Sequence, residues 1–372
     1  MKIPFFNYPS VYNDHRDAFI EILDKVGQSG AFIMQSDLED FEKEIAAYTG
    51  AKYAIGVGNA TDALEMLLKS AGITDGDEVI LSTHTMIATA SAIVANGGTP
   101  VPINCSEDHL INIEEIQKEI NSKTKCILPT QLNGRTANME KINYIAEKNG
   151  LFIIEDSAQA LGSKFKGKSA GTFGLGGCFS FYPAKVLGCL GDGGMIVCND
   201  DLLYENLLKD RDHGRNSNTG DVDIWGRNSR LDNLQASFLR YQFQFYEKVI
   251  SRRRAIAKFY CDELKIINSI LLPPEPSIND EHYDIYQNFE IEVTDRKNFT
   301  NYLESKGIGT LVQWGGKGIH QFKKLGFNKQ LHLSDKILKE MLLLPMNMSL
   351  HDEEVEYIVK TIISYFNDKK QL

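Results

Sequence analysis

One lysine in this sequence stands in surroundings that would make it reactive. Lys185 closes the aromatic segment 178–185 (CFSFYPAK) and is followed by the glycine-rich run 190–194 (LGDGG). A lysine in dry surroundings has a lowered pKa and forms a Schiff base with an aldehyde. Most lysines are solvated surface charges, so this segment alone also fits a lysine without a chemical role.

An aspartate near the middle of the chain is the second candidate. The run 151–159 (LFIIEDSAQ) is apolar and ends in acidic residues, as buried parallel strands do where their carboxyl ends meet a binding site. A carboxylate at such a place is costly without a cationic or metal partner. No metal-ligand cluster is nearby in the sequence, so a protonated heterocycle would serve as the partner of Asp156. A helix N-cap aspartate is the alternative.

Two further segments carry polar groups that could bind a ligand. Residues 56–62 (GVGNATD) begin like a dinucleotide-binding fingerprint, but Thr61 stands where the third glycine belongs. A strand-to-helix turn with free backbone N–H groups still suits a phosphate, although this segment alone fits a plain capped helix slightly better. Residues 226–230 (GRNSR) have the composition of an ordinary polar loop.

These features together fit one chemistry. A phosphate seat, an aspartate for a ring nitrogen and a lysine for an aldehyde are the three anchors that pyridoxal phosphate requires. The aspartate would keep the pyridine nitrogen protonated, so that the ring absorbs electrons from a substrate carbanion. The lysine would then move the proton.

The elements that position these residues alternate along the first two-thirds of the chain. Residues 36–39 (SDLE) form a capping box before a helical pattern, and Asn59 is a candidate N-cap of the next helix. Another amphipathic helix covers about 139–146. Strand-like runs stand at 53–57, 79–81, 100–103, 126–128 and 151–154. This alternation predicts an α/β fold with a mainly parallel sheet covered on both faces.

The last third of the chain has a different pattern. Residues 231–264 form one long helical stretch, and a proline-rich segment, 272–276, follows. Beyond it we expect a strand at 286–293 and helices at 295–306 and 351–366. The pattern predicts a large domain, 1–245, and a smaller α+β domain, 246–372.

Length and composition exclude several classes of protein. With 372 residues, 42% hydrophobic and 24% charged, the chain has an ordinary globular composition and room for two or three domains. Forty basic against fifty acidic residues give a net charge of −10, which argues against nucleic-acid binding. No signal-peptide pattern and no 18-residue apolar run is present, so we expect a cytoplasmic protein without a membrane span.

The six cysteines show neither CxxC spacing nor a zinc pattern with histidine. We therefore expect no metal site and no disulfide framework, but reduced and mostly buried cysteines.

The motifs, taken in order and spacing, resemble the DegT/DnrJ/EryC1/StrS aminotransferases, which act on nucleotide-linked keto-sugars. The resemblance runs from Ser36 through the C-terminal helix. It is carried by GVGNATDAL, TMIATASAIVANGGTPV, IIEDSAQALG, GKSAGTFG, FSFYPAKVLGCLGDGG, RDHG and GRNSRLDNLQA. It implies the fold-type I aminotransferase architecture: a large domain around a mainly parallel, seven-stranded sheet and a smaller α+β domain.

The resemblance also assigns roles to single residues. Lys185 matches the Schiff-base lysine and proton shuttle, and Asp156 matches the partner of the pyridinium nitrogen. Asn228 matches an asparagine that reaches the phosphate bound by the other subunit, which implies a homodimer with shared active sites. The remaining implied cofactor contacts are Ala60, Thr61 and Ser180 at the phosphate, Gln159 at the 3-hydroxyl and Met86 on the ring.

Two places depart from the family pattern. Met86 stands where relatives stack an aromatic ring on the cofactor, and its thioether could pack on the ring in the same way. The alternative is that Met86 is simply part of the core. Residues 311–320 (LVQWGGKGIH) replace a His-Tyr pair followed by prolines in the region of the sugar site. Trp314, Lys317 and His320 are candidates for substrate contact there, with a core tryptophan and a surface lysine as the alternatives. His213 in RDHG fits a structural role as well as a catalytic one.

We therefore predict a pyridoxal phosphate-dependent aminotransferase of amino-sugar biosynthesis for O-antigen (lipopolysaccharide), capsule, glycan or antibiotic pathways. Glutamate would convert the cofactor to pyridoxamine phosphate and leave as 2-oxoglutarate. The pyridoxamine phosphate would then aminate the keto group of a dTDP-linked 4-keto-6-deoxyhexose. A 3-keto-sugar aminotransferase is the alternative within the family. A sugar 3-dehydratase carries histidine in place of the Schiff-base lysine, so Lys185 argues against it. A non-catalytic binding or regulatory protein is the alternative of another class.

Overall fold

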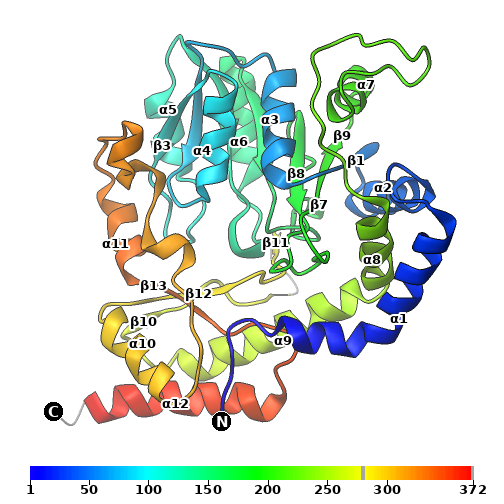
Figure 1. The fold of residues 1–372 in the computed structure, drawn as a ribbon. Helices are drawn as coiled ribbons and strands as arrows, with labels where there is room; N and C mark the ends of the chain where they lie inside the picture. The colour runs from blue at the N-terminus through cyan, green and yellow to red at the C-terminus, as the bar shows by residue number, and fades with distance from the viewer. Residues whose placement is uncertain (278–280, 370–372) are drawn as a thin grey trace.

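A seven-stranded sheet forms the centre of the computed structural model, which describes residues 1–277 and 281–369 (Figure 1). Its strand order is β1-β9-β8-β5-β4-β2-β3. Only β9 is antiparallel to its neighbours; the other pairs are parallel. The predicted mainly parallel α/β fold is confirmed. The strands are β1 (Tyr53–Val57), β2 (Glu78–Ser82), β3 (Thr99–Ile103), β4 (Thr124–Leu128), β5 (Phe152–Asp156), β8 (Gly176–Ser180) and β9 (Gly194–Cys198).

Helices cover both faces of this sheet, because successive strand residues point to opposite sides. Val79 and Leu81 pack into the core on one face, whereas Ile80 between them packs into the core on the other. The first face is covered by α3 (Ala60–Ser70), α4 (Ile87–Ala95) and α7 (Asp201–Arg211). The second is covered by α2 (Ser36–Thr49), α5 (Ile113–Glu119), α6 (Met139–Asn149) and α8 (Asn233–Phe243).

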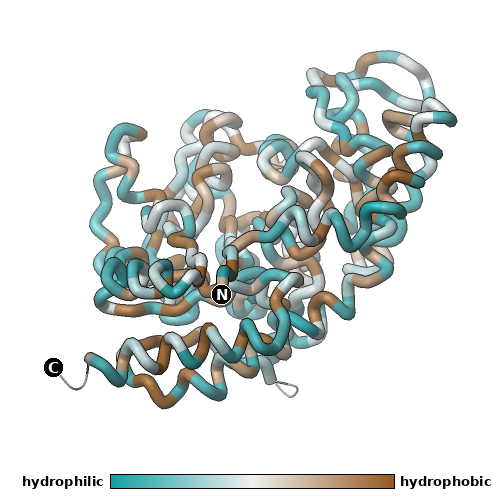
Figure 2. Tube along the Cα trace, turned by 60° about the horizontal axis from the view of Figure 1, so that its bottom comes forward, coloured by the Kyte–Doolittle hydropathy of each residue, from teal (hydrophilic) through white to brown (hydrophobic). Residues whose placement is uncertain are grey.

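A smaller unit lies below the large sheet in Figure 1 and has its own core. Its antiparallel sheet has the order β10-β12-β13, and the N-terminal residue Ile3 packs into the same core. Figure 2 shows hydrophilic and hydrophobic residues alternating along the helix next to the C-terminus, as expected for a helix with one buried face. The elements are α9 (Tyr246–Leu264), β10 (Ile270–Leu271), β12 (Phe289–Val293), α10 (Arg296–Ser305), β13 (Met341–Leu344) and α12 (Asp352–Lys369).

The remaining elements connect these two parts. A third small sheet has the order β11-β6-β7, so a strand that follows α9 in the sequence pairs with the chain between β5 and β8. Helix α9 contributes Tyr246 and Ile250 to a core of the large sheet and Ile256 to the core of the smaller unit. The domain boundary after residue 245 therefore stays a prediction. The connecting elements are α1 (Tyr8–Ser29), β6 (Lys164–Phe165), β7 (Lys168–Ser169), β11 (His282–Tyr283) and α11 (His332–Glu340).

Two local predictions were wrong. The stretch 231–264 is not one helix, since α8 ends at Phe243 and α9 begins at Tyr246. The rings of these two residues both pack against Tyr48, with centroids 5.1 Å and 5.9 Å away, so tertiary packing breaks the helix where the sequence has no breaker. The capping box at 36–39 is also absent: Gln35 is the N-cap, and it makes no side-chain cap. The N–H of Leu38 instead donates to the Asn233 side chain at 2.9 Å.

The predicted strand at 286–293 is shorter than expected. Tyr286 has a φ of 53°, a left-handed conformation that interrupts an extended strand, and β12 begins only at Phe289. All six cysteines are free and buried, as predicted. Among the described residues, no helix is long and apolar enough to cross a membrane.

Candidate active site

The predicted site residues gather at one edge of the large sheet. Strand β5 ends in Asp156, the parallel strand β8 ends in Ser180, and Lys185 lies in the turn that follows β8. Strand β1 leads into α3 at the same edge (Figure 1). Carboxyl ends of parallel strands are where open α/β sheets bind ligands, so the topology brings together three segments that are far apart in the sequence.

Asp156 is a buried carboxyl held by hydrogen bonds. Thr89 Oγ1 donates to Oδ2 at 2.7 Å, and the N–H of Ala158 donates to Oδ1 at 3.2 Å. Burial raises the pKa of Asp156, while these bonds and the positive charge of Lys185 act in the opposite direction. The site therefore holds a carboxyl that a nearby cation would stabilise in its ionised form.

The neighbouring Glu155 points to the other side of the strand and has a structural role. Its side chain accepts hydrogen bonds from the N–H groups of Gly171 at 2.9 Å and Phe173 at 2.6 Å, and from Gln131 Nε2 at 2.7 Å. These contacts fix the chain between β5 and β8. Of the two adjacent acids, Asp156 is the one that faces Lys185.

Lys185 is a partly buried amine with a lowered pKa. Burial lowers its pKa from 10.5 to about 8, although the negative charge of Asp156 opposes this shift. A substantial fraction of the side chain is therefore neutral, and so nucleophilic, slightly above neutral pH. Gln287 fixes the turn on both sides of the lysine, since Oε1 accepts from the N–H of Val186 at 2.9 Å and Nε2 donates to the carbonyl of Ala184 at 2.9 Å.

Gln159, Ser180 and Lys185 line one pocket, to which Gln287 also contributes. The side-chain oxygen of Gln159 accepts a hydrogen bond from the N–H of Asn133 at 2.8 Å. This bond fixes the amide so that its NH₂ group stays available to another acceptor. The three predicted residues are thus brought together, and Gln287 is a pocket residue that the sequence analysis missed.

The N-terminus of α3 offers backbone donors. Asn59 caps the helix and accepts from the N–H of Asp62 at 2.9 Å. Within the described residues, the N–H groups of Ala60 and Thr61 have no protein acceptor. Free N–H groups and the helix dipole make such a terminus suitable for a phosphate. Gly194 of β9 packs so closely that a Cβ there would lie 2.5 Å from the carbonyl carbon of Asn59, which explains a glycine at the end of the glycine-rich run.

The segment 226–230 lies against this helix terminus in the same chain. Ser229, which is buried, accepts a hydrogen bond from the N–H of Gly58 at 3.0 Å and donates one to Asp62 Oδ2 at 2.6 Å. Asn228 next to it is exposed, and its backbone forms a bridge with Asp212. The segment is therefore no ordinary loop, and Ser229 is a second residue that the sequence analysis missed.

Four further candidates have different surroundings. Met86 is 50% exposed, so the core alternative is wrong, and its contact with a cofactor ring stays a prediction. Lys317 is exposed, whereas Trp314 is partly buried and packs edge-on against His84 at 5.7 Å. His320 is buried and both of its ring nitrogens are engaged, with Thr83 Oγ1 at 2.6 Å and Asp335 Oδ1 at 2.9 Å. The structure therefore gives His320 an anchoring role.

His213 in RDHG is exposed and has a φ of 62°. Its backbone N–H donates to the carbonyl of Arg227 at 2.8 Å. The histidine thus ties two loop segments together through its backbone.

Comparison with known proteins identifies the family. The model of the DegT/DnrJ/EryC1/StrS aminotransferase family matches residues 13–363. The chain belongs to this family. It is 36% identical, over 98% of its length and 99% of the relative's, to dTDP-3-amino-3,6-dideoxy-alpha-D-galactopyranose transaminase of Aneurinibacillus thermoaerophilus. It is 35% identical, over the same shares of the two chains, to the "Pleiotropic regulatory protein" of Geobacillus stearothermophilus.

Solved structures of related proteins agree with this assignment. The structure of S. venezuelae DesV in complex with a ketimine intermediate has a TM-score of 0.93 and 32% identity, and covers 98% of each chain. That of NtdA from Bacillus subtilis, with bound cofactor PMP, has a TM-score of 0.91 and 28% identity, and covers 98% of this chain and 85% of that one. The fold-type I architecture is confirmed. The family depends on pyridoxal phosphate, so the predicted cofactor is confirmed as well.

Proposed function

We propose that this aminotransferase moves an amino group from glutamate to a keto group on a nucleotide-linked deoxyhexose. The observation that carries the proposal is the arrangement of Lys185 and Asp156: an amine with a pKa of about 8 and a buried carboxyl meet at the carboxyl edge of the sheet. The donor set also fits pyridoxal phosphate. Among the described residues, the N–H groups at the start of α3 have no protein acceptor and suit its phosphate, and Asp156 has no cationic hydrogen-bond partner and suits its ring nitrogen.

Pyridoxal phosphate, when bound, supplies an aldehyde that takes up the amino group and a ring that spreads negative charge from the substrate carbon. The protein side chains supply the protonation and the proton transfer. Asp156 holds a proton at the ring nitrogen, and Thr89 keeps that carboxylate oriented. Lys185 Nζ takes a proton from one carbon and returns it to another, for which a pKa near the working pH is favourable.

The remaining predicted residues would bind the cofactor and the substrate. We assign the phosphate to the N–H groups of Ala60 and Thr61 and to the hydroxyl of Ser180. The amide of Gln159 would bind the 3-hydroxyl of the cofactor, and Met86 would lie on its ring. Trp314 and Lys317 stay candidates for substrate contact, because they lie on a partly accessible segment of the chain.

The position of the keto group has two candidates. The sequence predicts a dTDP-linked 4-keto-6-deoxy sugar. The name of the Aneurinibacillus relative describes a 3-amino sugar, which favours a 3-keto substrate as the second candidate. Because the segment 311–320 departs from the family pattern at the expected sugar site, the choice depends on this chain's own residues.

We also propose that the working unit is a homodimer with shared active sites. Asn228 is exposed, yet it adjoins Ser229, which is hydrogen-bonded to the residues around the start of α3. An exposed amide beside a phosphate seat suits a contact with the seat of a second subunit. A symmetric dimer would make two such contacts, since the same patch is used on both subunits.

Turnover of a panel of 3-keto and 4-keto nucleotide sugars with glutamate tests the proposal. The expected result is 2-oxoglutarate in a one-to-one ratio with an amino sugar, whose amine position mass spectrometry and NMR would establish. Lys185→Ala, as the matched control, should form no product. If the cofactor-loaded protein aminates none of these sugars and its absorbance does not respond to glutamate, the enzymatic proposal is wrong and a regulatory role is favoured.

A further inference from the structure

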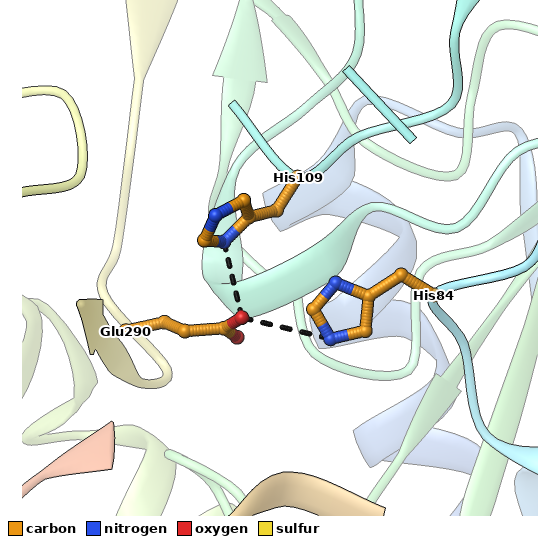
Figure 3. A group of neighbouring side chains, drawn as sticks. All are labelled: His84, His109 and Glu290. Carbon is orange, nitrogen blue, oxygen red and sulfur yellow. Dashed lines mark ion pairs between the residues drawn. The ribbon is translucent and has the colours of Figure 1, made fainter. Parts of the chain in front are cut away.

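Three buried side chains converge outside the cofactor pocket. His84 follows β2, His109 lies in the turn between β3 and α5, and Glu290 belongs to β12 of the smaller unit. They are 0%, 7% and 1% exposed. Figure 3 shows the two imidazoles pointing toward the carboxylate from different segments of the chain.

Two distances within this cluster are close to those between ligands of one metal ion. Glu290 Oε1 lies 3.1 Å from His109 Nδ1 and 3.6 Å from His84 Nε2. One ligand atom from each residue lies within 4.8 Å of the other two. Nitrogen and oxygen ligands stand about 2.0–2.2 Å from zinc, so around a tetrahedral centre they are separated by about 3.2–3.6 Å.

Three polar atoms of the cluster lack hydrogen bonds. Neither ring nitrogen of His84 has a hydrogen-bond partner in the described part of the chain, and Glu290 Oε1 has only ion-pair contacts there, of which the 3.1 Å contact with His109 Nδ1 is the shorter. At 3.6 Å, the His84–Glu290 pair is too long for a hydrogen bond. Buried polar atoms without partners are costly and rare. A cation between them would use both His84 Nε2 and Glu290 Oε1.

A second layer of residues orients two of the three side chains. The other ring nitrogen of His109 is 3.1 Å from Glu292 Oε1, and Asn133 Nδ2 donates to Glu290 Oε2 at 2.6 Å. Metal-bound histidines and carboxylates usually have such outer partners, which fix the tautomer and the direction of the ligand atom.

A protonated His109 between the two glutamates is the competing explanation. It accounts for His109, Glu290 and Glu292, but it leaves His84 buried with two unpartnered ring nitrogens. A divalent cation balances the two carboxylates and also uses His84. We propose that His84, His109 and Glu290 bind one divalent transition-metal ion of the zinc type. Two imidazoles and a carboxylate, with a fourth position left for water, are a known zinc ligand set.

This site would join the smaller unit to the large sheet, because two ligands come from loops of the sheet and one comes from β12. The sequence predicts no metal site, since the three ligands are far apart in the chain and form no spacing motif. The inference rests on this cluster alone and is independent of the proposed sugar substrate.

Metal analysis of the cofactor-loaded protein tests the proposal. The protein is first freed of metal with a chelator and then equilibrated with zinc chloride or cobalt chloride. After unbound ions are removed, mass spectrometry measures the bound metal, and visible absorbance shows the coordination of cobalt. We expect about one ion per chain and the visible bands of four-coordinate cobalt. Glu290→Gln should lower the affinity at least tenfold. Glu353→Gln, the same change at an exposed position of α12, should keep the wild-type value.

Two further measurements apply if Glu290→Gln does not fold. Glu292→Gln keeps all three ligands and should weaken binding by about 10- to 100-fold. Zinc at 100 times its Kd should shift the folding equilibrium of the wild type about 100-fold toward the folded state. Fewer than about 0.1 ion per wild-type chain would overturn the proposal, and so would a wild-type affinity for zinc in a folded Glu290→Gln variant.

Discussion

The hydroxyl of Thr89 holds the carboxylate on which the proposed cofactor chemistry depends, so Thr89→Val is a direct test. The change removes the donor that lies 2.7 Å from Asp156 Oδ2 and nearly preserves the volume of a fully buried side chain. Thr89 also shares a hydrogen bond of 2.8 Å with Thr85, which in turn accepts one from Thr130 at 2.8 Å. The carboxylate is thus the end of a chain of three hydroxyls.

The size of the effect follows from the charge on the acceptor. A hydrogen bond to an ionised group contributes about 1.5–3 kcal/mol. Its loss should therefore raise the pKa of Asp156, because the bond favours the ionised form. Burial already raises this pKa, so the change moves the titration further toward the working pH. If the ionised form binds the cofactor ring, the Kd of pyridoxal phosphate should rise about tenfold or more.

Cofactor titration and the pH dependence of the half-reaction with glutamate measure both effects. Because Asp156 must be deprotonated, the rising acid limb should move to higher pH in Thr89→Val. Thr85→Val is the matched control, one hydrogen bond further from the carboxylate, and should shift the limb less. An unchanged Kd together with an unchanged pH profile in Thr89→Val would refute the assignment of Asp156 as the ring partner.

Three other outcomes are expected. Without cofactor, Lys185→Met should raise the free energy of unfolding at pH 7 by up to about 3 kcal/mol, because the folded chain protonates a lysine whose pKa burial lowers to about 8. In urea titrations this gain should shrink toward pH 10.5, where the unfolded chain also loses the proton; a constant gain would contradict the shift. Ser229→Ala should weaken cofactor binding, measured by absorbance, whereas Ser237→Ala, which removes a bond within α8, should not; equal effects would disprove the link to the phosphate seat. Mixed dimers of Lys185→Ala and Asn228→Ala should recover about a quarter of the wild-type activity per chain, since random pairing makes half of the dimers mixed and each mixed dimer has one intact site; no recovery would contradict shared sites.

Five of the seven strands of the large sheet were predicted, because burial on both faces leaves apolar runs in the sequence, whereas β8 and β9 were not predicted. The run at 53–57 coincides with β1, and the run at 151–154 overlaps β5. The break between α8 and α9 was not predictable, since it depends on the packing of Phe243 and Tyr246 against Tyr48, which is remote in the sequence. Patterns within one segment therefore indicate the elements, while contacts between segments decide where the elements end.

The same division holds for the site. Lys185 and Asp156 stand in segments whose own composition predicts their chemistry, although each segment alone also fits a residue without a chemical role. Gln287 and Thr89 could not be found in this way, because each acts on a partner that only the fold brings near. Ser229 lies within one of the family motifs, but only the structure gives its contact with the start of α3.

The net charge of −10 raises the question of how this chain could hold two phosphorylated ligands. At physiological ionic strength, charges more than about 8 Å apart are largely screened, so the donors close to each phosphate decide its binding. The first turn of α3 contains one acid, Asp62, which accepts a hydrogen bond from Ser229 and contributes its N–H to the Asn59 cap. The N–H groups of Ala60 and Thr61 remain free beside it, within the part of the chain that the structure describes. The N-terminus of a helix whose first-turn acid is held in hydrogen bonds can therefore bind a phosphate within an acidic protein, and no basic surface is required.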